Sequence, residues 1–360
     1  MQESNATLVL FDDELSPSQG KNIEDAIGTR VMDRAELILD IFATRARTAE
    51  AKIQVELAQL EYMLPRLTRM WTHLEKFRGG IGVRGPGETQ LETDRRLINQ
   101  RIKVLRERLQ DVQRGRAIQR QSRQSEFKAS LVGYTNAGKS SILRGLSGAQ
   151  EIFVENRLFA TLDPLTRDVD LGGHSHVLVT DTVGFIRKLP HHLVASFRAT
   201  LEETREADLL LHVIDASSVS WEEQRVVVDQ VLDELGVKDI PKVLVFNKID
   251  LLEHDALLAL QDRIGALVPS SIFVSTVADG GLEPLKRVLA GAIRTRRPLR
   301  NIFLSPSDGK LLAEIHREGQ VLDQRMDGDR LLVEARVDDA LAGRLIRAGA
   351  EVSSNGKAPH

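Results

Sequence analysis

The sequence predicts an α/β protein with a parallel β-sheet, preceded by an antiparallel helical hairpin and followed by a small α+β unit. Three observations carry this prediction. Apolar strand-like runs alternate with helical patterns from residue 127 to 297, two coiled-coil seams flank a glycine-rich stretch within residues 33–126, and residues 298–360 alternate strand and helix patterns around one hairpin. A chain of 360 residues is long enough for several domains. We expect four, at residues 1–32, 33–126, 127–297 and 298–360.

The composition excludes several classes of protein. A hydrophobic content of 42% is ordinary for a globular chain, and the absence of cysteine rules out disulfides, thiolate metal sites and thiol nucleophiles. The first residues lack a basic start followed by an apolar stretch, and no run approaches the ~18 apolar residues of a membrane span. We expect a cytoplasmic protein without integral membrane association.

Residues 1–32 are typical of a partial βαβ unit. The stretches TLVLF and RVMD are strand-like, and SPSQGKNIEDAIG between them is helical. Ser16 and Pro17 fit a helix cap and a first helical position, and Gly28 fits the helix end. One such unit is too small to be stable alone, so it should pack on the residues that follow.

The region from Asp33 to Phe77 predicts a long helical segment, in which Pro65 should kink the helix or relax one turn. Its apolar residues are spaced alternately by four and three positions, as in a coiled coil. They are Ile53, Leu57, Leu60, Leu64, Leu67, Trp71 and Leu74. A second helix should start at the capping box formed by Thr89 and Glu92. Its seam comprises Ile98, Ile102, Leu105, Leu109 and Val112.

The two seams predict a hairpin with RGGIGVRGPGE, residues 78–88, at its tip. A parallel dimeric coiled coil needs an unbroken helix, which five glycines and a proline oppose, so we expect a monomer. Residues 66–123 carry 15 basic and 6 acidic side chains in a chain whose net charge is −3. This asymmetry favours a polyanionic partner. Residues 113–126 lack periodicity and are typical of a linker or a frayed helix end.

A phosphate-binding pattern follows the first strand of the predicted sheet. Residues 133–140, GYTNAGKS, match GxxxxGK[ST] between the strand-like ASLV and the helical SILRGL. Glycines let backbone N–H groups converge on a phosphate, and the helix N-terminus adds its dipole. Lys139 would bridge the β- and γ-phosphates, and the Ser140 hydroxyl would bind Mg²⁺.

Two further patterns at strand ends select the nucleotide. In DTVG, Asp181 would hold a water of the Mg²⁺ shell, and the Gly184 N–H would sense the γ-phosphate. In NKID, the Asp250 carboxylate would accept hydrogen bonds from guanine N1–H and N2–H₂, a pair that adenine does not offer. Asn247 would brace the phosphate loop, and the stem of Lys248 would lie over the purine. These patterns, in this order, predict a GTP site and not an ATP site.

Another Mg²⁺ ligand should come from the stretch FATLDPLTRD. Thr161 and Thr166 both qualify chemically, and Thr161, 21 residues after Ser140, has the more comfortable reach. Arg167 fits an exposed role better than that of an internal charge-stabilising finger. The stretch Ser275 to Val277 would offer a backbone N–H to guanine O6, although this signal is weak by itself.

The activation of the attacking water is left open by the sequence. Phe185 follows Gly184, and an apolar ring cannot orient water by hydrogen bonding, so intrinsic turnover should be slow. A partner or a second cation must then assist. Asn136 is a candidate K⁺ ligand, or it only braces the phosphate loop. The histidine pairs lack an accompanying carboxylate cluster and are interpreted as surface residues: His174 with His176, and His191 with His192.

The glycine-rich stretch GGIGVRGPGETQLE at 79–92, together with GYTNAGKSS, FATLDPLTR, DTVGFIRKLP and NKID, resembles the HflX family of translational GTPases. The resemblance runs from about Leu8 to the C-terminal unit. It implies a GTPase that binds the large ribosomal subunit and its rRNA, with a role in splitting or rescuing ribosomes, and no DNA partner. It also implies that Phe159 to Asp163 form the first switch, with Thr161 on Mg²⁺. The hairpin tip would then face ribosomal RNA.

Three features depart from the pattern of that family. Its members usually carry a longer N-terminal subdomain, so any activity lodged there is in doubt for this chain. Thr276 stands where alanine is usual, and Arg144 replaces a customary asparagine.

The expected site is extensive. Lys139, Thr161 and Gly184 are the expected catalytic residues, Ser140 and Thr161 are the expected Mg²⁺ ligands, and K⁺ is the candidate second cation. The expected contacts to GTP or GDP are Gly133, Tyr134, Thr135, Asn136, Ala137, Gly138, Lys139, Ser140, Phe159, Ala160, Thr161, Leu162, Asp163, Asp181, Thr182, Val183, Gly184, Asn247, Lys248, Ile249, Asp250, Ser275, Thr276 and Val277. The expected RNA contacts are Arg78, Gly79, Gly80, Gly82, Arg84, Gly85, Gly87, Arg95 and Arg96.

Two alternatives to a ribosome-stimulated GTPase are open at this point. One is an RNA-binding module in which GTP only stabilises a conformation and hydrolysis is negligible. The other is a K⁺-dependent GTPase that acts in rRNA or tRNA maturation or in ribosome biogenesis.

Overall fold

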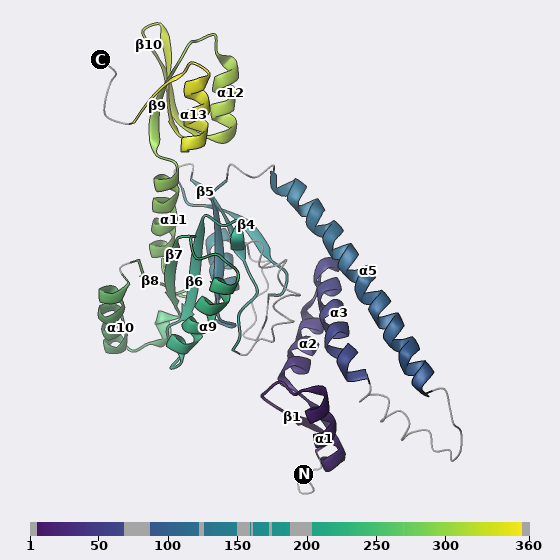
Figure 1. Cartoon of the computed structure of the whole chain (residues 1–360). Helices are drawn as coiled ribbons and strands as arrows, with labels where there is room; N and C mark the ends of the chain where they lie inside the picture. Colours follow the sequence, from purple (N-terminus) through teal and green to yellow (C-terminus); the bar gives the residue numbers. More distant parts are fainter. Residues whose placement is uncertain are drawn as a thin grey trace.

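The computed structural model describes residues 6–67, 87–121, 126–149, 159, 161–172, 175–187, 204–268 and 270–354. Within these residues there are three sheets: a pair of strands near the N-terminus, a central sheet of six strands and a C-terminal sheet of four. In Figure 1 the central sheet lies between the N-terminal helices and the C-terminal unit. None of the described helices is long and apolar enough to cross a membrane.

The N-terminal unit is the predicted strand, helix and strand. Strands β1 (Leu8–Leu10) and β2 (Arg30–Met32) pair in parallel, and α1 (Pro17–Ile27) connects them. Ser16 forms a capping box at the start of α1, and Gly28 ends the helix with φ of 68°. The predicted start and end of this helix are therefore confirmed.

In its described part, residues 33–67, the expected long helical segment is two helices, α2 (Arg34–Arg45) and α3 (Ala49–Met63), followed by the 3₁₀ turn η1 (Leu64–Arg66) at Pro65. Residues 68–77, with Trp71 and Leu74 of the predicted seam, lie outside the described residues. The turn agrees with the effect predicted for that proline. The sequence has no glycine or proline at the break between α2 and α3. Ala46 is extended, and the Thr48 side chain caps α3 by accepting a hydrogen bond from the backbone N–H of Ala51.

Helix α5 (Gly87–Gln121) packs along α3 with the opposite chain direction, as Figure 1 shows, which confirms the helical hairpin. The contact is the predicted pair of seams, made of Ile53, Leu57, Leu60, Leu64, Ile98, Ile102, Leu105 and Leu109. Two details differ from the expectation. Residues 87–90 are already helical, so Thr89 is not an N-cap, and the expected linker is helical as far as Gln121. The arginines and glutamines of that stretch are good helix formers and extend the helix without an apolar seam.

The central sheet has the order β4-β5-β3-β6-β7-β8. Its parallel strands are β3 (Lys128–Gly133), β5 (His176–Asp181), β6 (Leu209–Asp215), β7 (Lys242–Asn247) and β8 (Ile272–Phe273). The edge strand β4 (Leu165–Asp170) was not predicted, and it pairs antiparallel with β5. Val169 is its only buried residue, and such a polar edge strand lacks the apolar run that marks the inner strands.

Helices cover both faces of this sheet, in agreement with the predicted α/β class. Helices α6 (Lys139–Ser147) and α11 (Glu283–Arg296) share one apolar cluster with it. Helices α9 (Trp221–Glu234) and α10 (His254–Leu267) pack in the clusters on the other face. The short η2 (Ile249–Leu251) follows β7. This layering brings the carboxyl ends of the strands to one edge, where ligands of such sheets bind.

The C-terminal unit has the predicted order of strand, helix, hairpin, helix and strand. Its elements are β9 (Leu299–Leu304), α12 (Gly309–Glu318), β10 (Gln320–Asp327), β11 (Arg330–Arg336), α13 (Asp339–Arg347) and β12 (Glu351–Ser354). The sheet is antiparallel with the order β10-β11-β9-β12. The predicted hairpin is β10 and β11, and Gly328, with φ of 60°, lies in its turn.

One further apolar cluster joins the N-terminal helices to the central domain. Phe42 of α2 and Val55 of α3 lie in it together with Phe159, Leu162 and Val183, which belong to the loops at the carboxyl edge of the sheet. The hairpin therefore packs directly beside the candidate site.

Candidate functional site

A cavity of about 320 Å³ lies at the carboxyl ends of β3, β5 and β7. Each of the sequence patterns that predicted a nucleotide site contributes to its wall. The lining residues are Thr135, Asn136, Gly138, Lys139, Ser140, Ser141, Phe159, Thr161, Thr182, Gly184, Asn247, Lys248, Asp250, Leu251, Thr276 and Val277.

The loop between β3 and α6 is shaped by close backbone approaches. A Cβ atom at Gly133 would lie 2.3 Å from the Val213 carbonyl oxygen, so only glycine fits. Gly138, with φ of 97°, leaves room for the Asn247 amide, whose Nδ2 donates to the Ala137 carbonyl at 3.0 Å. The loop thereby ends at the N-terminus of α6, where backbone N–H groups attract anions.

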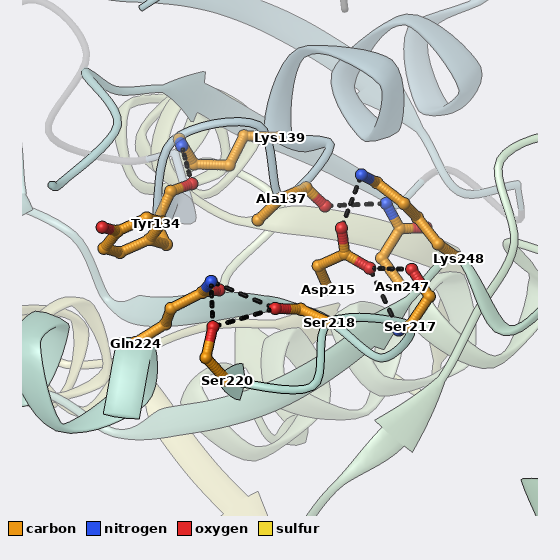
Figure 2. A network of polar contacts seen from close by, with 10 residues as sticks. All are labelled: Tyr134, Ala137, Lys139, Asp215, Ser217, Ser218, Ser220, Gln224, Asn247 and Lys248. Atoms are coloured by element: carbon orange, nitrogen blue, oxygen red, sulfur yellow. Dashed lines mark hydrogen bonds and ion pairs between the residues drawn. The ribbon is translucent and has the colours of Figure 1, made fainter. Parts of the chain in front are cut away.

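Lys139 is the buried cation of this loop. Its ammonium donates to the carbonyls of Gly133 at 3.2 Å and Tyr134 at 3.0 Å, and Figure 2 shows the second of these contacts. Burial lowers the pKa of Lys139 to about 8, against the opposing charge of Asp181. A phosphate group in the cavity would favour the charged ammonium, so this residue is suited to an anionic ligand.

Three oxygen-bearing side chains converge next to Lys139. The Ser140 hydroxyl donates to Asp181 Oδ2 at 2.6 Å, Thr161 donates to the same oxygen at 2.9 Å, and the two hydroxyls lie 2.7 Å apart. Asp181 is fully buried, and burial raises its pKa. Its Oδ1 has no hydrogen-bond partner among the described residues. This set of hard oxygen ligands fits Mg²⁺ beside a phosphate.

The opposite end of the cavity presents Asp250. Its Oδ1 accepts a hydrogen bond from Ser275 Oγ at 2.6 Å. Ser275 Oγ in turn accepts hydrogen bonds from the backbone N–H groups of Val277 and Ala278, each at 3.2 Å. The carboxylate is therefore oriented by the loop after β8 and keeps further lone pairs for a ligand.

Lys248 stands in the left-handed region, with φ of 64°. Its ammonium pairs with Asp215 Oδ2 at 2.6 Å, and Asp215 Oδ1 accepts from Ser217, as Figure 2 shows. Lys248 also lines the cavity, so this pair holds its stem there. The sequence interpretation missed Asp215, although its place at the carboxyl end of β6 could have suggested it. It also missed the lining residues Ser141 and Leu251.

The two candidate threonines are separated by the fold. Thr161 lies at Ser140, whereas Thr166 lies in β4 and is 2.9 Å from Thr180 of β5. Arg167 is part of the same edge strand and donates to a backbone carbonyl. The structure thus brings Thr161, and not Thr166, to the oxygen cluster.

Several expected nucleotide contacts do not line the cavity, and their roles stay predictions. Leu162 and Val183 are buried in the cluster with α2 and α3, and Asp163 faces the start of α3. The others outside the lining are Gly133, Tyr134, Ala137, Asp181, Ile249 and Ser275, which are adjacent to it or brace it. The Phe185 ring is buried on the α9 side of the sheet.

Part of the expected site lies outside the described residues. This applies to Ala160 and to the tip residues Arg78, Gly79, Gly80, Gly82, Arg84 and Gly85, and also to His174, His191 and His192. Arg95 and Arg96 are exposed on α5, and Gly87 begins that helix. Within the described ranges, no group of three histidine, aspartate or glutamate side chains could hold a metal ion.

Three family models match the chain. They are described as "GTP-binding GTPase N-terminal" over residues 1–43, "GTP-binding GTPase Middle Region" over residues 45–123, and "50S ribosome-binding GTPase" over residues 128–248.

Known relatives match most of the chain. "GTPase HflX" of Magnetococcus marinus is 45% identical over 348 residues, which cover 96% of this chain and 79% of the relative. "GTPase HflX" of Escherichia coli K12 is 46% identical over 334 residues, 91% of this chain and 77% of the relative. Among solved structures, a GTP-binding protein of Sulfolobus solfataricus in complex with GDP is 26% identical with a TM-score of 0.47, over 81% of this chain and 83% of that one.

Proposed function

The chain belongs to the HflX family of GTPases, and we propose on this basis that GTP hydrolysis in the cavity changes the affinity of the protein for the large ribosomal subunit. GTP hydrolysis itself is the activity of the family. The observation that carries the proposal is the placement of Lys139, the Ser140–Thr161–Asp181 cluster and Asp250 around one cavity. It matches a triphosphate at one end and a guanine at the other.

The roles that we propose follow from these positions. Lys139 neutralises the β- and γ-phosphates, and the N–H groups at the start of α6 and of Gly184 bind phosphate oxygens. Ser140 and Thr161 bind Mg²⁺, and Asp181 holds a water of its shell. Mg²⁺ supplies positive charge that offsets the charge developing on the phosphates. Asp250 reads guanine.

The ribosomal partner is supported by charge and by the family model of the central domain, whose description names 50S binding. Residues 66–123 are strongly basic, and α5 exposes Arg95 and Arg96 on the hairpin arm. Arginines on a projecting arm suit the phosphate backbone of rRNA. Ribosome splitting or rescue would follow from a nucleotide-dependent grip.

Phe185 favours a second candidate function, an RNA-binding switch with negligible hydrolysis. Its ring is buried in the core, and its backbone N–H and carbonyl pair with Gly133 and Thr135. The side chain therefore neither faces the cavity nor offers a polar atom to water.

The other alternative is a K⁺-dependent GTPase. A K⁺ ion held by Asn136, which lines the cavity with φ of 62°, would supply positive charge to stabilise the transition state.

One experiment separates these functions: GTP turnover of the full chain with and without large subunits, in K⁺ and in Na⁺ buffer. We expect slow turnover alone and a rise of at least about ten-fold with subunits, since a GTPase with the apolar Phe185 after Gly184 needs its partner to orient the water. ATP is the matched control and should not be hydrolysed. Subunit binding that depends on GTP without any turnover would support the second candidate. A rate that subunits leave unchanged in both salts contradicts the proposal.

A further inference from the structure

We propose that Asp163 is a positioning residue that ties the first switch to the N-terminus of α3. Through this contact, the packing of the helical hairpin depends on whether the nucleotide holds Thr161. Asp163 lies two residues after Thr161 in the chain. Its carboxylate accepts a hydrogen bond from the Thr48 hydroxyl, and its Oδ2 lies 3.3 Å from the backbone N–H groups of both Arg47 and Thr48.

This contact is of the kind that fixes a carboxylate in place. The N–H groups that precede and start a helix have no intrahelical partner, and the helix dipole favours negative charge there. Asp163 therefore supplements the cap that Thr48 provides to α3. Asp163 is not part of the cavity lining, and a carboxylate there would be repelled by an anionic nucleotide.

The residues on either side of Thr161 also pack against α2 and α3. The ring of Phe159 meets Phe42 of α2 edge to face, with centroids 4.6 Å apart, and Leu162 is buried in the cluster of α2 and α3. Among the described residues from Phe159 to Asp163, Thr161 faces Ser140 while its neighbours pack against the two helices. Movement of Thr161 must therefore displace contacts of α2 and α3.

The second loop at the phosphate end contacts the same helices. Val183 and Ile186 belong to the cluster of α2 and α3, and Arg34 of α2 donates to the Arg187 carbonyl at 3.0 Å. The two loops that would contact the γ-phosphate, around Thr161 and around Gly184, thus both pack against α2 and α3. Helix α3 in turn packs along α5 through the seam. A contiguous packed path connects the cavity to the arm.

The coupling must work in both directions. If a γ-phosphate that holds Thr161 stabilises the contact between Asp163 and α3, then an intact contact raises the affinity for GTP relative to GDP by the same factor. A ribosome that pulls on the arm would by the same contact alter the position of Thr161. The inference rests on the proposed function in one respect, that the cavity holds a nucleoside triphosphate with Mg²⁺.

The test measures how Thr48→Asp and Asp163→Asn change the ratio of dissociation constants for GDP and a non-hydrolysable GTP analogue, in the full chain with Mg²⁺. In Thr48→Asp, the new carboxylate can still cap α3 but repels Asp163. We expect both variants to lose roughly five-fold or more of the preference for the triphosphate, with GDP affinity little changed. Thr44→Asp is the matched control, because Thr44 is exposed on α2 and its hydroxyl bonds the Ile41 carbonyl instead of Asp163.

A double variant distinguishes this role from simple destabilisation. Thr48→Asp combined with Asp163→Asn should shift the ratio no further than either change alone, because both break one contact. Equal losses of GDP and GTP-analogue affinity, or a ratio unchanged within two-fold in Asp163→Asn, would overturn the inference. Wild-type protein that binds no guanine nucleotide would instead refute the proposed function.

Discussion

Lys139 shows how one residue can be identified from its pattern while its electrostatics depend on the fold. The pattern GxxxxGK[ST] assigned its chemistry, and the structure adds that the ammonium is buried between two backbone carbonyls. That burial lowers its pKa to about 8 in the protein without nucleotide.

A pH dependence of nucleotide binding follows. Phosphates bind the charged ammonium, so affinity for GDP should be full below the pKa of about 8 and should fall roughly ten-fold per pH unit above it. Calorimetry in buffers of different ionisation enthalpy should show little proton uptake on binding at pH 7 and most of one proton at pH 8.5. Lys139→Arg is the control, because a guanidinium does not titrate in this range. Equal proton uptake at both pH values would contradict the burial argument.

Asp163 and Asp215 show what a residue-by-residue reading misses. Asp163 is an expected GTP contact in the first switch that the resemblance implies, and this expectation gave no hint that its carboxylate also contacts the start of α3. Asp215 carries no pattern of its own and gains its role only because β6 and β7 are neighbours in the sheet. In both cases the partner lies far away in the chain, beyond the reach of local spacing.

At the scale of elements, apolar periodicity predicted the hairpin well because its seam is local in sequence and long. Every described member of the two predicted seams except Leu67 and Val112 lies in the α3–α5 contact. Local signals were weaker at boundaries. The break before α3 and the length of α5 depend on capping contacts and on helix propensity, which leave no apolar pattern.

The seam also yields a stability prediction. Leu105 is fully buried between α3 and α5, so Leu105→Ala should lower the free energy of unfolding of the hairpin by about 2–5 kcal/mol. Leu97→Ala on the same helix is the matched control, since Leu97 is 56% exposed and its truncation should cost less than about 0.5 kcal/mol. Urea unfolding followed by circular dichroism measures both. Similar destabilisation of the two variants would mean that the seam does not stabilise the hairpin.

At the scale of the whole molecule, positive charge is concentrated in residues 66–123, which include helix α5 of the hairpin arm. The candidate nucleotide site lies beside α2 and α3, at the other end of this packed path. Under the proposed function, this arrangement would let a change of one phosphate in the cavity alter the binding of the arm to rRNA through the contacts of α2 and α3. The C-terminal unit has its own apolar core and belongs to neither part of this path.

The charge on the arm gives the last prediction. Arg95→Ala with Arg96→Ala should weaken binding to large subunits and should reduce the salt dependence of that affinity by about one unit of log–log slope for each phosphate that is no longer neutralised. GDP affinity should be unchanged. Arg317→Ala with Arg325→Ala, which removes the same charge from the C-terminal unit, is the control. Sedimentation with subunits across a salt series measures the effect, and equal slopes for both pairs would contradict an RNA contact on α5.

Local patterns in the sequence specify the class of fold, the guanine nucleotide site and the basic hairpin, because strand ends are followed by phosphate and base motifs and apolar seams repeat at helical spacing. Only the packed fold brings Thr161 to Ser140 at the cavity and Asp163 to the start of α3. Asp163 and Thr48 are 115 residues apart, and Lys248 and Asp215 are 33 apart. Such contacts arise when packed elements meet, and no spacing along the chain encodes them.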